Sequence, residues 1–186
     1  MTKKRLKSGL LRTSLFITVC ALVGGAVSCS SSNSSSSPET LGLIPVEIAA
    51  PDFTLPTTTG TEISLSELQG TPVVLNFWAI QCPPCRMELP YFDVVAKQYS
   101  DRVTIVAIDI QDSLPQIKKF FGDSEVSFTV ALDKNAQVFS SYAIQNAIPS
   151  TFFIDSQSVI RYIRLGAFTN KMELQASIGE LLSKGG

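Results

Sequence analysis

The sequence predicts an α/β fold in which helices cover both faces of a mainly parallel sheet. From residue 72 onward, short apolar runs rich in β-branched and aromatic residues alternate with segments of helical periodicity. Two adjacent apolar runs and one further helical segment then close the chain. A hydrophobic content of 45% over 186 residues suits one domain with a sizeable core and a tail.

The elements follow in order along the chain. Residues 50–70, "APDFTLPTTTGTEISLSELQG", predict a short extended segment, a turn at Gly60, a second short strand and a helical turn. A buried strand is expected at 72–79, and Pro83 and Pro84 then open a helix to about Tyr99, because proline is tolerated in the first turn. Further strands are expected at 102–110, 126–133, 150–155 and 159–168, the last two forming a hairpin that turns at 156–158. Further helices are expected at 113–123, 135–144 and 170–183, the last with an apolar face of Met172, Leu174, Ile178, Leu181 and Leu182.

The first 28 residues have the layout of an export signal. Basic residues precede the apolar run "SLFITVCALVGGAV", which is shorter than the roughly 20 residues of a bilayer span. "AVSC" (26–29) then resembles a bacterial lipobox, in which Cys29 becomes the lipid-modified first residue; the alternative is an uncleaved anchor with an ordinary Cys29. We expect a signal peptide at 1–28 and a protein exported and anchored by lipid to the outer face of the cytoplasmic membrane.

A serine-rich tether follows the leader. "SSSNSSSSP" (30–38) cannot bury apolar surface, so residues 29–45 are expected to be a disordered tether before a folded domain at 46–186. Fully stretched, the serine-rich stretch reaches roughly 30 Å, which keeps the domain close to the membrane.

Composition excludes several classes of function. Histidine is absent, which removes Ser-His-Asp and Cys-His catalysis in their usual form and the commonest transition-metal ligand. Five of the 15 basic residues precede the first acidic one, so the remainder carries ten basic against 16 acidic side chains. That net charge of about −6 suits no nucleic-acid partner, and neither a metal nor a cofactor is expected.

Two cysteines in "WAIQCPPCRMELP" (78–90) remain for chemistry, because Cys20 lies in the leader and Cys29 would carry lipid. A zinc site would need two further thiolates or histidine. A structural staple between Cys82 and Cys85 would close a loop of only four residues and stabilise the fold little. The remaining interpretation is a redox-active dithiol–disulfide pair.

The position of the pair predicts the role of each sulfur. Cys82 starts a helix, where free N–H groups and the helix dipole favour a thiolate, so its pKa should fall from about 8.5 to roughly 3.5–7.5. Cys82 is therefore the expected nucleophile, and Cys85, one turn on, resolves the mixed disulfide. Pro83 and Pro84 support this site by pre-setting the first turn, but they withhold two N–H donors, so their net effect on the redox potential stays open.

Two neighbouring side chains are candidates for supporting the pair. Glu88 lies three residues after Cys85 on the same helical face, either as a solvated carboxylate or as an acid that handles the Cys85 proton. Trp78 ends a strand four positions before Cys82, and we expect it to form a wall beside the sulfurs rather than a core residue.

Four sequence blocks together resemble a known family. "APDFTL", "LSELQGTPVVLNFWA", "CPPCRMELP" and "AIPSTFFID" occur in the order and spacing of the TlpA/ResA branch of the thioredoxin superfamily, over about residues 50–184. The resemblance implies a thioredoxin fold with a central mixed sheet, an N-terminal extension and an inserted helix–strand unit at about 111–132. It also implies a cis peptide bond at Pro149 beside the cysteines, with Ile148, Pro149 and Ser150 binding the substrate backbone as an added strand. Glu88 matches the active-site glutamate of that family.

The resemblance implies a membrane-anchored, extracytoplasmic thiol–disulfide oxidoreductase. We expect it to reduce disulfides in exported client proteins, including apocytochrome c, with electrons from a membrane thiol carrier. The alternatives are an oxidase that donates disulfides, a thiol peroxidase and a copper-delivering metal chaperone. Ala79 stands where a thiol peroxidase has threonine, and the missing histidine argues against the copper chaperone.

Overall fold

The computed structural model describes residues 37–142 and 147–184. The expected signal peptide at 1–28, Cys20 and Cys29 lie outside these residues. Within the described part of the chain, no helix is both long and apolar enough to cross a membrane.

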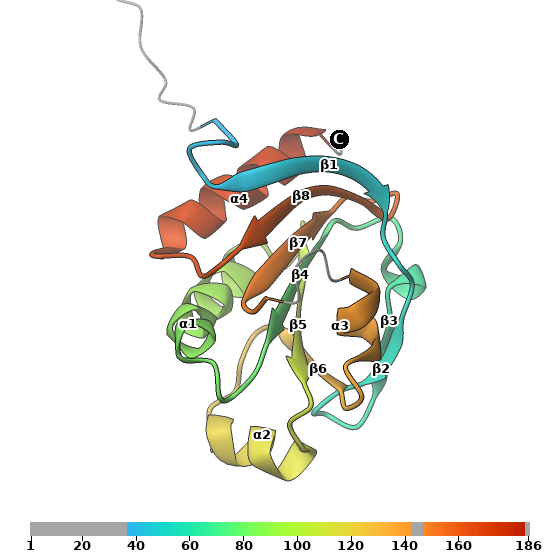
Figure 1. Cartoon of the computed structure of the whole chain (residues 1–186), viewed down its shortest axis with the longest axis vertical. Helices are drawn as coiled ribbons and strands as arrows, with labels where there is room; N and C mark the ends of the chain where they lie inside the picture. The colour runs from blue at the N-terminus through green and yellow to red at the C-terminus, as the bar shows by residue number, and fades with distance from the viewer. Residues whose placement is uncertain (1–36, 143–146, 185–186) are drawn as a thin grey trace, which may run out of the picture. The chain divides into compact units, whose positions relative to one another are not determined.

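One six-stranded mixed sheet organises the domain (Figure 1). Its strands, in spatial order, are β1 (Leu43–Ala49), β8 (Val159–Leu165), β7 (Ser150–Ile154), β4 (Val73–Trp78), β5 (Thr104–Ile110) and β6 (Thr129–Asp133). A separate hairpin consists of β2 (Thr54–Pro56) and β3 (Glu62–Ser64). The helix–strand unit expected at about 111–132 is therefore present, and its strand β6 forms one edge of the sheet.

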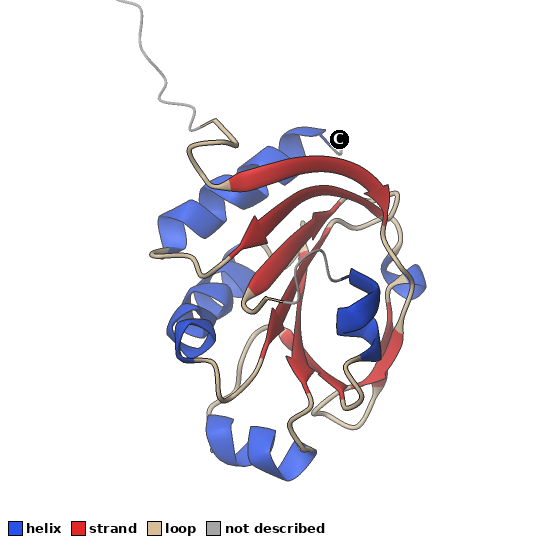
Figure 2. Cartoon of the chain, in the orientation of Figure 1, coloured by secondary structure: helices blue, strands red, loops and turns tan. Residues whose placement is uncertain are grey.

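Helices cover both faces of this sheet (Figure 2). They are η1 (Ser66–Leu68), α1 (Pro83–Gln98), α2 (Leu114–Phe121), α3 (Gln137–Tyr142) and α4 (Lys171–Lys184). The helices α1 and α4 lie together on one face, while α3 and the β2–β3 hairpin lie on the other. The expected helix boundaries at Ser113 and Gly122 are confirmed as the N-cap and C-cap of α2.

Strand β4 lies inside the sheet and separates two apolar cores. All six of its residues are buried, and their side chains alternate between the faces. Val74 and Trp78 belong to the core under α1 and α4, whereas Leu75 and Phe77 belong to the core under α3. Asn76 shares the face of Val74 and Trp78, so this polar side chain points toward α1.

The expectation of a mainly parallel sheet is wrong for three of its six strands. β4, β5 and β6 are parallel, but β7 is antiparallel to β4, and β8 and β1 continue antiparallel. Ser150 at the start of β7 pairs with Phe77 near the end of β4, so β7 begins at the end of the sheet where β4 and its parallel neighbours β5 and β6 finish, and it runs back antiparallel to β4. The mixed sheet implied by the family resemblance is confirmed.

Two further expectations need correction. The disordered tether was expected to reach residue 45, but β1 starts at Leu43, because Leu41 and Leu43 are buried and β1 pairs with β8. Met172 was expected on the apolar face of α4, yet it is 67% exposed. It precedes the buried Leu174 by two residues, which is about 200° around a helix.

Candidate active site

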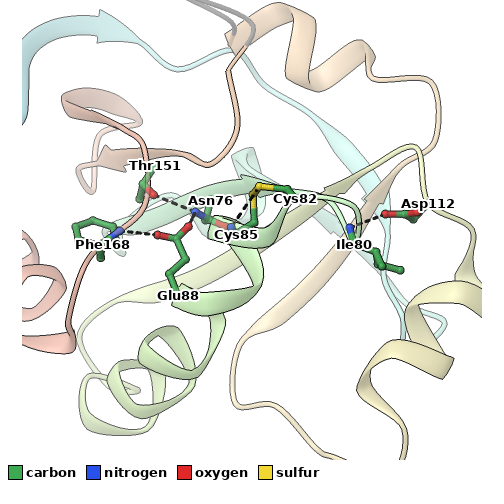
Figure 3. The surroundings of a disulfide bond; sticks show 8 residues. All are labelled: Asn76, Ile80, Cys82, Cys85, Glu88, Asp112, Thr151 and Phe168. Carbon is green, nitrogen blue, oxygen red and sulfur yellow. Dashed lines mark hydrogen bonds between the residues drawn. A yellow bond between two sulfur atoms is a disulfide. The ribbon is translucent and has the colours of Figure 1, made fainter.

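The cysteine pair lies where β4 passes into α1, as expected (Figure 3). Cys82 is the N-cap of α1 and forms a disulfide with Cys85, with their Cα atoms 5.3 Å apart. The Cys85 N–H donates to Cys82 Sγ at 3.2 Å. Pro83 and Pro84 have no N–H, so Cys85 supplies the first backbone donor of the helix that this sulfur can use.

The two cysteines differ in exposure to solvent. Cys82 is 8% exposed, whereas Cys85 is fully buried. A client sulfur can therefore approach Cys82 more readily than Cys85, which fits the expected division between nucleophile and resolving residue.

Trp78 was expected to form a wall beside the sulfurs rather than a core residue, but the structure shows a core residue. Its side chain is fully buried in the apolar cluster that also contains Cys82 and Cys85. The rings of Phe120 and Phe121 pack against it, with centroids 5.5 and 5.7 Å away. Because Trp78 still belongs to β4, its side chain lies inside the sheet–helix layer, where α2 covers it.

Glu88 is fully buried on α1, one turn beyond Cys85. The Asn76 side-chain amide donates to Oε1 at 2.9 Å, and the Phe168 N–H donates to Oε2 at 2.8 Å (Figure 3). Burial raises the pKa of Glu88 to about 7, against the opposing effect of these two hydrogen bonds and of the Arg164 charge. The alternative of a solvated surface carboxylate is therefore excluded, and the carboxyl can exchange a proton near neutral pH.

A hydrogen-bond network behind Glu88 was only partly visible in the sequence. Asn76 also donates to Thr151 Oγ1 at 3.0 Å, which links β4 to β7. Asn76 had a signal, because a polar residue interrupts an otherwise apolar strand. Phe168 had none, since it contributes a backbone N–H from a loop 80 residues further along the chain.

The expected cis peptide bond between Ile148 and Pro149 is confirmed. Ser150, the residue after this bond, pairs with Phe77 near the end of β4. The cis bond therefore lies at the same end of β4 as the loop that leads to Cys82. Ser150 is buried and paired on both sides, with Phe77 and with Leu165, and the Pro149 carbonyl accepts from Gly166 N–H. Of the three residues expected to bind substrate, Ile148 alone is half-buried rather than buried.

The loop between β4 and Cys82 has an anchor that the sequence did not reveal. The Ile80 N–H donates to Asp112 Oδ2 at 2.8 Å (Figure 3). The Asp112 N–H donates in turn to Asp109 Oδ1 at 3.0 Å. Asp109 is fully buried, and burial together with the nearby Asp112 carboxylate raises its pKa to about 8. Asp112 and Asp109 together therefore tie the loop before Cys82 to the end of β5.

The described residues contain no cluster of three or more side chains that could hold a metal ion. The side chains gathered at the site offer a carboxyl at Glu88 that can transfer a proton and two sulfurs that can exchange disulfide partners.

Comparison with known proteins agrees with this geometry. The model of the AhpC/TSA family matches residues 46–163. The chain belongs to the AhpC/TSA family. It is 37% identical over 127 residues to the thiol-disulfide oxidoreductase ResA of Bacillus subtilis, covering 66% of this chain and 69% of ResA. It is also 34% identical over 125 residues to the thioredoxin-like protein YneN of the same organism, covering 66% and 72%.

Solved structures of similar proteins show the same fold. A putative thiol:disulfide interchange protein DsbE from Chlorobium tepidum aligns with a TM-score of 0.67 and 30% identity, covering 73% of this chain and 96% of that one. The structure of MTB dsbF in its mixed oxidized and reduced forms aligns with a TM-score of 0.64 and 28% identity, covering 73% of this chain and 99% of dsbF. This member of the AhpC/TSA family is therefore a thioredoxin-like thiol–disulfide oxidoreductase.

Proposed function

We propose that the protein reduces disulfides of exported proteins outside the cytoplasmic membrane, through the Cys82–Cys85 pair. The observation that carries this proposal is the disulfide at the N-terminus of α1, with a buried carboxyl of near-neutral pKa one turn behind it. The nucleophilic cysteine needs a stabilised thiolate in order to exchange disulfide partners. The resolving cysteine needs a group that accepts its proton before it can attack.

The first step is attack by the reduced form of the protein on a client. The Cys82 thiolate attacks one sulfur of the client disulfide, forming a Cys82–client disulfide. The other client sulfur leaves as a thiolate and takes a proton from water. The helix terminus favours the Cys82 thiolate electrostatically, and the Cys85 N–H is already aimed at its sulfur.

The second step releases the client. Cys85 gives its proton to the Glu88 carboxylate, and the resulting thiolate attacks Cys82 Sγ. The second client sulfur leaves as a thiolate and takes, through water, the proton that Glu88 received, which restores the Glu88 carboxylate as the Cys82–Cys85 disulfide forms. Two electrons and two protons pass to the client in total, and a membrane thiol carrier returns the protein to its dithiol form by the same exchange chemistry.

The location follows from the first part of the chain. We propose that residues 1–28 are removed on export, and that lipid on Cys29 holds the protein at the outer face of the membrane. The serine-rich stretch before β1 then lets the domain reach clients within a few tens of Å of the bilayer. Apocytochrome c, whose haem-binding cysteines must be reduced, is a client of the right chemical class.

Trapping of the mixed disulfide tests this function. Cys85→Ser removes the resolving thiol, so clients should accumulate as covalent adducts of Cys82 in cells, and thiol treatment should release them. Cys82→Ser is the matched control and should trap none. Equal adduct levels in the two variants would contradict the assigned roles.

The redox potential separates reduction from the alternative of disulfide donation. A reductase is expected near −270 mV, in the range of thioredoxin, and a donor of disulfides near −120 mV. Equilibration of the protein with glutathione buffers, followed by alkylation, gives the value. A result near −120 mV would replace reduction by oxidation in this proposal.

A further inference from the structure

A row of residues crosses the sheet from Asn76, the hydrogen-bond partner of Glu88, to strand β1. In the register of the sheet, Asn76 lies opposite Thr151, Thr151 opposite Arg164, and Arg164 opposite Leu43. Residues directly opposite one another project to the same face. Arg164 therefore points to the face covered by α1, on which Asn76 and Glu88 meet.

The Arg164 guanidinium binds the backbone around Phe168. Its Nη2 donates to the Ala167 carbonyl at 3.1 Å, and its carbon lies 4.7 Å from the centre of the Phe168 ring. Nη1 donates to the Leu41 carbonyl, and the side chain is only 13% exposed. The backbone segment that Arg164 contacts in this way carries the Phe168 N–H, which donates to Glu88 Oε2.

We propose that Arg164 is a positioning residue for Glu88: its guanidinium holds the Ala167–Phe168 backbone against the buried carboxyl and supplies the positive charge that favours the ionised form. This inference rests on the role proposed above for Glu88 in accepting the Cys85 proton. The Arg164 charge and the Phe168 hydrogen bond both lower the pKa of Glu88, against the dominant effect of burial.

Other charged groups near Glu88 act in the opposite direction. From α4, Glu173 pairs with Arg164 Nη2 at 3.3 Å and also accepts from Thr169. Burial disfavours the Glu173 carboxylate, but hydrogen bonds from Thr169 and the Arg164 charge outweigh this and lower its pKa. Glu173 therefore remains ionised and offsets part of the Arg164 charge. From α1 the neighbouring titratable groups are Cys85 and Tyr91, whose hydroxyl donates to the Thr169 carbonyl. The side chains from β4 and β7 are the neutral Asn76 and Thr151.

The test measures the titration of Glu88 directly. The Glu88 carboxyl carbon is followed by NMR against pH in the full chain, kept oxidised so that the cysteines do not titrate, and its signal is assigned by its loss in Glu88→Gln. Arg164→Gln should raise the midpoint by roughly half a pH unit, less than a directly contacting charge produces. At pH 7 this lowers the ionised fraction of Glu88 about twofold.

Three further variants separate the effects of the Arg164 charge and of its hydrogen bonds on the Glu88 midpoint. Arg161→Gln is the matched control, because Arg161 is an arginine of the same strand that pairs with Asp155 and Glu47 instead of with the backbone around Phe168, and it should not move the midpoint. Arg164→Lys keeps the charge but cannot make all the bonds of the guanidinium, so its shift should be smaller than that of Arg164→Gln. Glu173→Gln should lower the midpoint.

Equal midpoints in Arg164→Gln and Arg161→Gln would overturn the inference. If Arg164→Gln does not fold, Glu173→Gln decides: failure to lower the midpoint counts against the role of Arg164. The role of Glu88 is tested separately, since an unchanged pH profile of disulfide exchange in Glu88→Gln removes that role but leaves the titration result intact.

Discussion

The buried carboxyl of Glu88 should make a contribution to the stability of the oxidised protein that falls as pH rises. In the folded protein its pKa is about 7, whereas the ordinary value is 4.5. The folded state therefore holds a proton that the unfolded chain has lost, so the contribution of Glu88 to stability is greatest below about pH 4.5 and is lost as pH rises to about 7. Glu88→Gln removes this titration while keeping the shape of the side chain.

The size of the effect follows from the two pKa values. Their difference of about 2.5 corresponds to about 3 kcal/mol of unfolding free energy, at roughly 1.4 kcal/mol for each pH unit. Replacing one carboxyl oxygen by an NH₂ group also loses a hydrogen bond from Asn76 or Phe168, which costs about 1–3 kcal/mol. That cost does not depend on pH, so it cancels when the difference between wild type and variant is compared across pH.

Urea unfolding of both oxidised proteins at pH 4.5, 6 and 8 measures this difference. Relative to wild type, Glu88→Gln should gain about 3 kcal/mol between the lowest and the highest pH. Asp109 titrates in both proteins and does not contribute to the comparison. A difference that stays constant within about 0.5 kcal/mol would refute the assignment of a raised pKa to Glu88.

Two other changes test the surroundings of the site. Asp112→Ala removes the acceptor of the Ile80 N–H, which should cost about 1 kcal/mol and speed exchange of that amide, whereas Asp112→Asn keeps an acceptor oxygen and should protect it. Equal exchange in the two variants would show that this bond does not hold the loop. Asn76→Asp places a second carboxyl against Glu88, so one of the pair should keep its proton to higher pH than Glu88 does alone. Carbon NMR of the oxidised variant reads this out, and an unchanged Glu88 midpoint would contradict it.

The local features of the site were predictable because their causes lie within a few residues. Two prolines after Cys82 set the first turn of α1, and the apolar run before it forms a buried strand. The extent of α2 between Ser113 and Gly122 was also predictable, because both caps are short-range signals.

The direction of β7 and the surroundings of Glu88 were decided by tertiary structure. Periodicity predicts that a strand exists, but the path of the preceding connection fixes whether it runs parallel to β4. The partners of Glu88 are Asn76, on strand β4, and Phe168, in a distant loop. The sequence marks Asn76 as a polar residue in an apolar strand, but nothing in it pairs either residue with Glu88.

The sequence by itself determined the reactive pair and the helix that carries it, since spacing and proline act locally. Only the tertiary structure decided how acidic Glu88 is, because its pKa depends on burial, on hydrogen bonds from Phe168 and Asn76, and on the Arg164 charge, which come from separate parts of the chain.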